Sequence, residues 1–502
     1  MASPASPHQP HFIRLLFPIF GLLFLITLAC NFPSLAVQET PPAVEEVSTT
    51  SAEPLPEPSV TPTDLSTPTA GVTPEAQHSQ DNLSMTGPWV ILAAQDRLWA
   101  ANLDGSAPSG LVNQASTAWY IHQVALAPKG GFLSFTASWE ANNLSHLSLF
   151  VAKLPEMTTK MVAELTVEST DPAGGGEMCQ PSLETTRAMA VGSAMAWSPD
   201  GRSLVFIGGQ DGESADVYGY SVDTEQITRL SSEPAHAFNP SWSPDGRDIV
   251  FFTATCFGTG AGFEMDGAWV VPASGGQAPT LYSLLPDSIN ETVVGWSGTR
   301  EVITRTSSSN PGSVLRRVNL DSGQENVLSD EPFYDAAIAP DGTAALVADG
   351  GTLLFPPAGD VIRIVSLPAT QVTYSPGRNS FFVMDMNIQS QEVSLTGELL
   401  QLMTLLELPL FSPGGQWWAS VLGSDLYISQ AMWYEESSYT GLIENLFWVQ
   451  DPVTGVETLF FRGGSSTEAM RFYKASEPDF TVQQVSGITV MGGITGGGVL
   501  YP

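Results

Sequence analysis

Residues 197–202 read Trp-Ser-Pro-Asp-Gly-Arg, and residues 242–247 repeat the same six residues. In such a turn Pro fixes φ, Asp hydrogen-bonds back to the backbone and Gly adopts a positive φ. A short apolar run follows each copy, at 204–207 and at 249–252. An apolar residue, a tight turn and an immediate second apolar run predict a β-hairpin. We therefore assign the Asp and Arg of this motif a structural role and not a catalytic one.

Five weaker copies of the motif occur elsewhere in the chain, each with a large apolar residue two positions before a Pro or a Gly. They are Leu126-Ala-Pro128, Trp296-Ser-Gly298, Ile338-Ala-Pro340, Tyr374-Ser-Pro376 and Phe411-Ser-Pro413. Successive copies lie between 36 (376−340) and 71 (199−128) residues apart. A period near 40 residues is typical of a four-stranded propeller blade. The sequence therefore predicts an all-β β-propeller over residues 86–502, with the apolar residue of each copy facing the neighbouring blade and no long amphipathic helix.

Seven copies of the motif predict seven blades, and the chain offers strands for an eighth. Residues 89–93 and 97–100, followed by the Leu103-Asp-Gly105 turn, have the pattern of later blade strands without a first strand. The Gly-rich tail around residues 485–501 can supply that missing strand. Strands from both ends of the chain would then close the ring and remove its exposed edges. Eight blades are favoured, and seven are the alternative.

The two complete motifs, after Trp197 and Trp242, resemble the WD-like repeats of the TolB type, which are found in bacterial envelope proteins. The resemblance is strong over residues 190–255, and the motif spacing extends it across roughly 120–460. In that family the propeller usually serves as a platform for protein contacts or ligand binding, and the repeat also occurs as an accessory domain in peptidases. The resemblance thus implies a fold more than a function.

The N-terminus has the layout of a secretory signal peptide over residues 1–30. It begins with a polar segment that contains Arg14 and continues with a largely apolar stretch, and its Leu28-Ala29-Cys30 end is similar to a bacterial lipobox. The lipobox usually has an aliphatic residue where this chain has Thr27. We predict lipidation of Cys30, which would anchor the protein on the outer face of a bacterial membrane. Ordinary cleavage to a soluble secreted protein and an uncleaved anchor over residues 15–37 are the alternatives.

Residues 31–85 separate this signal from the predicted propeller. From 38 to 80 they are dominated by Pro, Thr, Ser, Glu, Ala and Val, and they contain no Lys, Arg or large aromatic residue. Such a segment cannot bury enough apolar area to offset the entropy of ordering it. We expect a disordered, fairly extended tether that holds the folded domain away from the membrane surface.

The charge of the chain restricts its partners. The formal net charge is −34, from 18 basic and 52 acidic residues. A protein this acidic repels nucleic acid and anionic lipid headgroups, so neither is expected as a direct ligand. Contact with the membrane is then expected only through the N-terminal lipid.

Strand order assigns the connections to the two faces of a propeller. Turns between first and second strands share one face, and we place the long insertions, among them 138–142, 256–266 and 424–443, on the opposite face. Asn319–Gly323 and Asp451–Gly455 are expected to join third strands to fourth strands.

The long insertions supply the candidate ligand-binding residues. Long loops on a rigid scaffold are where binding usually resides, and aromatic rings beside carboxylates suit sugars or basic peptide segments. The candidates are Trp139, Glu140, Trp433, Tyr434, Glu435 and Glu436. The alternative is that these aromatic rings hold their own loops against the propeller.

Two cysteines remain after Cys30 is assigned to the anchor. Cys179 and Cys256 are expected on the same face of neighbouring blades, in an oxidising compartment where disulfides persist. We predict a disulfide between them, which would stabilise the fold by roughly 4 kcal/mol in the chain-entropy model. Two unpaired, buried thiols are the alternative.

Signatures of common catalytic sites are missing from the sequence. There is no Gly-x-Ser-x-Gly elbow, no His-x-x-x-His or Cys-x-x-Cys spacing and no phosphate-binding Gly loop. No catalytic residue, metal or cofactor is therefore predicted. The preferred function is a non-enzymatic cell-surface lipoprotein whose propeller binds an envelope or extracellular protein or a glycan. The alternative is a propeller enzyme of the glycoside hydrolase or lyase type acting on extracellular polysaccharide, because paired carboxylates meet in space and not in sequence.

Overall fold

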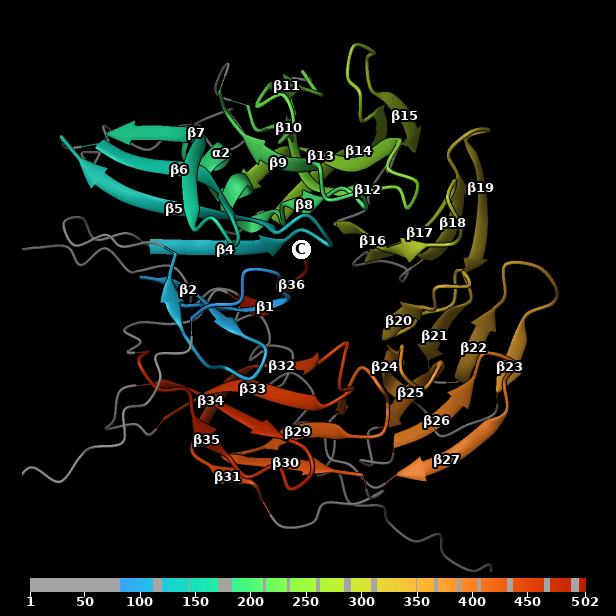
Figure 1. The fold of residues 1–502 in the computed structure, drawn as a ribbon. Coiled ribbons are helices and arrows are strands. Elements are labelled where there is room, and N and C mark those ends of the chain that lie inside the picture. The colour runs from blue at the N-terminus through green and yellow to red at the C-terminus, as the bar shows by residue number, and fades with distance from the viewer. Residues whose placement is uncertain are drawn as a thin grey trace, which may run out of the picture. The chain divides into compact units, whose positions relative to one another are not determined.

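The computed structural model describes most of the chain from residue 82 onward. The described residues are 82–111, 120–142, 144–169, 183–210, 214–232, 235–258, 262–283, 290–307, 314–348, 350–364, 369–385, 390–403, 408–430, 437–464, 470–488 and 496–502. They form nine four-stranded sheets, in which every neighbouring pair of strands is antiparallel (Figure 1). The one helix in these ranges is α2 (Leu183–Gly192), a short element between the second and third sheets. Within the same ranges, no helix has the length and apolar character needed to cross a membrane.

Each sheet is one blade, whose strands run in order from first to fourth. Blade 1 contains β36 (Gly496–Leu500), β1 (Trp89–Ala93), β2 (Leu98–Asn102) and β3 (Ser109–Gly110); blade 2 contains β4 (Tyr120–Leu126), β5 (Phe132–Ala141), β6 (Leu144–Lys153) and β7 (Thr158–Ser169). Blade 3 contains β8 (Ala196–Trp197), β9 (Ser203–Gly208), β10 (Asp216–Ser221) and β11 (Ile227–Arg229); blade 4 contains β12 (His236–Trp242), β13 (Asp248–Gly258), β14 (Gly262–Pro272) and β15 (Thr280–Ser283). Blade 5 contains β16 (Asn290–Trp296), β17 (Glu301–Ser307), β18 (Val314–Asn319) and β19 (Gln324–Ser329); blade 6 contains β20 (Asp335–Ile338), β21 (Ala344–Ala348), β22 (Gly351–Phe355) and β23 (Ile362–Ile364). Blade 7 contains β24 (Ala369–Ser375), β25 (Ser380–Asp385), β26 (Ser390–Ser394) and β27 (Leu399–Met403); blade 8 contains β28 (Leu410–Phe411), β29 (Trp418–Leu422), β30 (Asp425–Ser429) and β31 (Tyr439–Thr440). Blade 9 contains β32 (Leu442–Gln450), β33 (Glu457–Gly464), β34 (Arg471–Ser476) and β35 (Gln483–Gln484).

Buried apolar clusters join each blade to the next. One cluster runs from blade 2 to blade 5, and three others join blades 5 and 6, blades 6 and 7, and blades 8 and 9. Phe382 and Trp418 join blade 7 to blade 8. Two further clusters connect blade 1 to blade 9 on one side and to blade 2 on the other. The packing is therefore continuous around the ring, and the protein is a nine-bladed β-propeller.

The all-β propeller of four-stranded blades is confirmed, but the predicted count of eight or seven blades is wrong. The missed unit is blade 9, because its first turn has no Ser-Pro. The sequence pattern predicts a third-to-fourth connection at Asp451–Gly455, whereas this turn joins β32 to β33, the first and second strands. Asp451 takes the place of the motif Ser there: its amide donates to Val456 O at 2.9 Å, as the Ser412 amide donates to Trp417 O at 2.9 Å in blade 8.

The ring closes with strands from both ends of the described chain, as predicted. β36 pairs with β1 in antiparallel register, from Trp89 opposite Leu500 to Ala93 opposite Gly496. Leu500 is fully buried, so the closing strand contributes a core side chain as well as a hydrogen-bond ladder. The sheet edge that β1 would otherwise expose is covered.

The complete motifs position the blades as predicted. In blade 4 the Ser243 hydroxyl donates to Asp245 at 2.7 Å, the Arg247 amide donates to the same carboxylate at 3.2 Å, and Gly246 has a φ of 72°. The Trp242 indole donates to Ala196 O of blade 3 at 2.9 Å, and the Trp197 indole donates to Ala125 O of blade 2 at 3.2 Å. The side chain of each motif Trp thus connects its own blade to the preceding blade.

Candidate functional site

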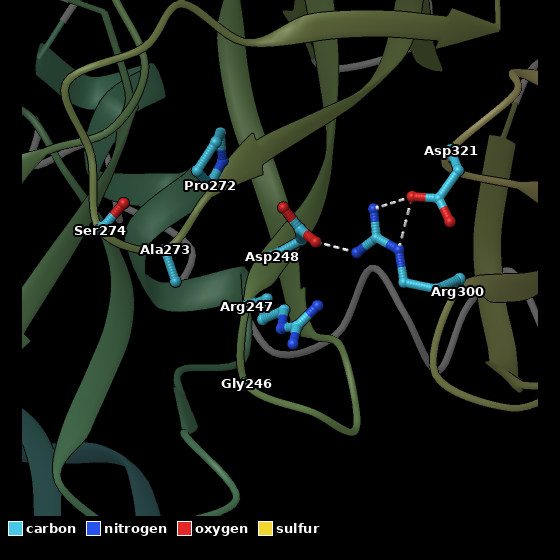
Figure 2. Close-up of a pocket in the computed structure, with 8 residues that line it drawn as sticks. All are labelled: Gly246, Arg247, Asp248, Pro272, Ala273, Ser274, Arg300 and Asp321. Atoms are coloured by element: carbon cyan, nitrogen blue, oxygen red, sulfur yellow. Dashed lines mark hydrogen bonds and ion pairs between the residues drawn. The ribbon is translucent and has the colours of Figure 1, made fainter.

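The first-to-second-strand turns and the third-to-fourth-strand turns lie at the same end of the blades, which we call the turn face. Two cavities of about 500 and 410 Å³ open there, and Figure 2 shows the residues of the larger one. The larger cavity is lined by Gly246, Arg247, Asp248, Pro272, Ala273, Ser274, Arg300 and Asp321. The smaller one is lined by Lys129, Ser198, Pro199, Asp200, Ser203, Trp242, Asp245, Gly246, Ala273 and Ser274. The two cavities meet at three residues of blade 4, Gly246, Ala273 and Ser274, and together they extend across blades 2 to 5; we call the pair the turn-face groove.

Closely packed turns form the floor of this groove. Gly201 has a φ of 71°, and a Cβ at this position would lie 2.2 Å from the carbonyl oxygen of Lys129 in the preceding blade. A Cβ on Gly246 would meet Pro199 Cδ of blade 3 at 3.6 Å. A side chain at position 201 would therefore clash with the turn of blade 2, so Gly is needed where these two turns meet.

Arg300 connects blades 4 and 5 at one end of the groove. Its guanidinium is hydrogen-bonded to Asp248 of blade 4, and its Nε donates to Asp321 of blade 5 at 2.8 Å (Figure 2). The hydrogen bond with Asp321 raises the pKa of Arg300 against the opposing effect of burial, and Asp248 adds to the rise. One cation thus bridges two carboxylates of neighbouring blades.

The carboxylates of the motif turns are held in their charged form. The hydrogen bond from Ser198 lowers the pKa of Asp200, and the charges of Lys129 and Arg202 add to this effect. Burial acts to raise the pKa of Asp245, but hydrogen bonds from Ser243 and from the Arg247 amide bring it below its usual range. The lining of the groove therefore presents charges of both signs, which suits a polar ligand.

The predicted candidates in the first long insertion, Trp139 and Glu140, lie in strand β5 and not in a loop. The Trp139 ring stacks on His146 of the paired strand with centroids 4.1 Å apart and an interplanar angle of 10°, and its indole donates to Ser148 at 3.3 Å. Glu140 is exposed and pairs across the hairpin with Ser145. Trp139 therefore packs on its own hairpin, as the alternative to ligand binding predicts.

The structure describes one of the remaining predicted site residues, Cys256. Cys30, Cys179, Trp433, Tyr434, Glu435 and Glu436 lie outside the described residues. Cys256 lies in β13 opposite Glu264 of β14, and its disulfide with Cys179 stays a prediction.

The face predicted for the 424–443 insertion, opposite the motif turns, needs correction. β30 ends at Ser429, which pairs with Trp418, the residue directly after the first turn of blade 8. The connection that follows β30 therefore starts at the turn face, the same face as the groove.

No protein-family model matches the chain, and no curated protein matches it. Solved structures do resemble it. TolB from Acinetobacter baumannii is 14% identical, with 62% of this chain and 61% of that chain covered and a TM-score of 0.30. Porphyromonas gingivalis dipeptidyl peptidase 4 is 10% identical, with 76% and 64% covered and a TM-score of 0.48. The C-terminal WD40 domain of Sif2 is 13% identical, with 78% and 99% covered and a TM-score of 0.38.

The fold is established by the nine blades themselves. The chain is a β-propeller. It spans less than two thirds of the TolB and peptidase chains. Propellers with and without catalytic activity share this architecture, so function has to be argued from the site.

The groove was not predicted from the sequence because every residue of the motif was assigned a structural role. That role holds for Asp200 and Asp245, whose carboxylates bond within their own turns. Arg247 differs from these carboxylates, because its side chain is 78% exposed and lines the groove. The signal in the sequence was a basic residue near the first turn of four successive blades: Lys129, Arg202, Arg247 and Arg300.

A half-buried histidine of blade 2, at the end away from the turn face, gives a prediction for acid stability. Burial, together with the Arg187 charge, lowers the pKa of His122 from 6.5 to about 4. Between pH 6.5 and about 4, His122 is protonated in the unfolded chain but not in the folded chain. The free energy of unfolding therefore decreases as pH falls from 6.5 towards 4. We expect the free energy of unfolding, measured with urea, to fall by about 2–3 kcal/mol less in His122→Gln than in the wild type between pH 7 and pH 4.5. Parallel losses in the two proteins would contradict this assignment.

Proposed function

We propose that this protein is a non-enzymatic binding platform on the outer face of a bacterial membrane, whose turn-face groove holds a segment of an envelope or extracellular protein. The continuity of the groove over four blades carries this proposal. Its floor of packed turns is set before any ligand arrives, so binding there would cost little ordering of the propeller. A cleft that crosses several blades suits an extended segment better than a compact small molecule.

The lining of the groove favours a protein segment over a glycan. Its side chains include Lys129, Arg247 and Arg300 among the carboxylates of the motif turns. Trp242 is the one aromatic residue that lines the two cavities, and its indole is bonded to the preceding blade. Sugar sites commonly offer an open aromatic face, whereas alternating charges match the polar side chains of a peptide.

The N-terminal sequence supports the proposed location. A lipidated Cys30 followed by the tether of residues 31–85 would hold the propeller clear of the lipid. The net charge of −34 keeps the propeller itself from anionic headgroups, so the anchor would be its contact with the membrane.

Crosslinked capture from native cell envelopes tests the proposed function. Ala273 lines both cavities, so Ala273→Trp would fill the groove. Leu402→Trp adds the same ring at an exposed position in β27 of blade 7, outside the groove, and is the matched control. We expect one dominant protein to be captured by the wild type and by the control and to be lost with Ala273→Trp, while all three melt alike.

Two results would count against the proposal. Capture that survives Ala273→Trp would show that the partner does not use the groove. If no protein is captured, a protein partner is wrong, and binding on a glycan array would then replace the protein by a polysaccharide.

A further inference from the structure

Blades 3 and 5, on either side of blade 4, each contain an ion pair that connects two turns of the same blade. In blade 3 the Arg202 Nη1 lies 2.8 Å from both carboxylate oxygens of Asp223. In blade 5 the Arg300 Nε donates to Asp321 at 2.8 Å. In each blade the Arg follows the first strand, and the Asp sits on the turn between the third and fourth strands.

Backbone hydrogen bonds align blade 4 with this pattern without ambiguity. The Val222 amide donates to Arg202 O at 3.0 Å, the Leu320 amide to Arg300 O at 2.9 Å, and the Ala273 amide to Arg247 O at 2.8 Å. The residue that follows each donating amide therefore holds the same structural position in the three blades. That residue is Asp223 in blade 3, Asp321 in blade 5 and Ser274 in blade 4.

Blade 4 thus keeps the cation of the repeated pair and lacks the anion. The Arg247 side chain is 78% exposed, compared with 64% for Arg202 and 26% for Arg300. Its closest carboxylate is Asp245 of the same turn, at 3.6 Å, a weak contact for a side chain this exposed. Figure 2 shows the Arg247 guanidinium without an interaction to the other lining residues, while Arg300 is bonded on both sides. Both Arg247 and Ser274 line the groove.

We propose that Arg247 and Ser274 form a binding point for the carboxylate of an Asp or Glu side chain in the segment that the groove holds. The ligand carboxylate would take the place that Asp223 and Asp321 hold in the flanking blades, and the Ser274 hydroxyl leaves room for it and can donate to it. Arg binds a carboxylate through two parallel N–H donors, which fixes orientation as well as position. This inference rests on the proposed function, because it names the chemistry by which the groove recognises its partner.

The surrounding charges allow an anionic group at this point. Asp248 and Asp321 are the other carboxylates that line this cavity, and Arg300 is bonded to both. Lys129 adds an exposed cation at the far end of the groove. The net charge of −34 acts over a longer range, where salt screens it with a Debye length of about 8 Å under physiological conditions.

An array of twelve-residue peptides whose central residue is Glu in one set and Gln in the other tests the proposal. The full chain is compared with Ser274→Asp, which restores the internal pair seen in blades 3 and 5. Ser274→Asn is the matched control, since it has the same size without the charge. We expect the wild type to bind the Glu set about tenfold more tightly than the Gln set, a preference that high salt reduces. Ser274→Asn, which loses the hydroxyl but leaves Arg247 available, should bind both sets more weakly than the wild type and still prefer Glu. Ser274→Asp should narrow the difference to less than twofold without a change in melting temperature.

The results separate this inference from the proposed function. An unchanged preference for Glu in Ser274→Asp, or no peptide binding at all, would overturn the carboxylate site. An envelope protein captured equally by the wild type and Ser274→Asp, but not by Ala273→Trp, would keep the platform and also overturn this site. If the peptides bind with the expected preference but no envelope protein is captured, the carboxylate site is supported and a protein partner in the envelope is not.

Discussion

Deletion of residues 496–502 is expected to abolish the cooperative folding of blade 1 and to lower the melting temperature by at least about 10 °C. These residues supply β36, which pairs with all five residues of β1. Leu500 is fully buried, and Tyr501 O accepts a hydrogen bond from the Gly131 amide of blade 2 at 2.8 Å. Removing a buried Leu costs about 2–5 kcal/mol, and each lost backbone hydrogen bond adds about 1 kcal/mol. The total is comparable with the stability of a whole domain.

Calorimetry with two point variants separates closure from a general effect of truncation. A Cβ on Gly497 would lie 2.7 Å from the Phe447 ring and 2.9 Å from Ile91 O, so Gly497→Val should force β36 out of place. Tyr501 is 43% exposed, and Tyr501→Ala should cost less than about 1 kcal/mol. A deletion variant that melts like Tyr501→Ala would show that β36 does not close the ring.

The sequence specified those parts of the fold whose physics is local. Trp197 and Trp242 precede turns in which Ser, Pro, Asp and Gly each have a conformational task, so hairpins and blades follow from them. The closing strand could be predicted because β1 needed a partner that the adjacent sequence did not offer. Blade 9 was missed because Asp451 performs the task of the motif Ser inside a turn that also resembles a third-to-fourth connection.

The groove depends on relations between blades, which no local pattern records. That Ser274 stands where Asp223 and Asp321 stand elsewhere is visible only after hydrogen bonds align the turns. Similarly, the sequence around Trp139 is typical of a binding loop, and this residue lies instead in an extended strand with its ring on His146. Exposed aromatic residues in a sequence are ambiguous until their neighbours in space are known.

A second large effect is expected at the junction of blades 7 and 8. Phe382 and Trp418 are the fully buried members of the apolar cluster there, Leu408, Phe411 and Tyr427 pack against them, and a polar contact adds to this packing. Arg378 donates to Glu392 through Nε at 3.1 Å and Nη2 at 2.9 Å, and its Nη1 donates to Gly415 O of blade 8 at 3.1 Å. Its guanidinium also lies 5.8 Å from the Phe411 ring centroid of blade 8.

Arg378→Met is expected to destabilise the protein by about 3–5 kcal/mol, because it leaves a buried carboxylate without its cation. The Glu392 side chain is 4% exposed, and of its side-chain hydrogen bonds the one from Ser380, at 2.7 Å, would remain. The double variant Arg378→Met, Glu392→Gln removes the stranded charge and should recover at least half of the loss, which urea unfolding of the single and double variants measures at constant pH. If the double variant is no more stable than Arg378→Met, the loss comes from the contacts with Gly415 and Phe411 and not from the unpaired carboxylate. A single variant within about 1 kcal/mol of the wild type would mean that apolar packing alone holds blades 7 and 8 together.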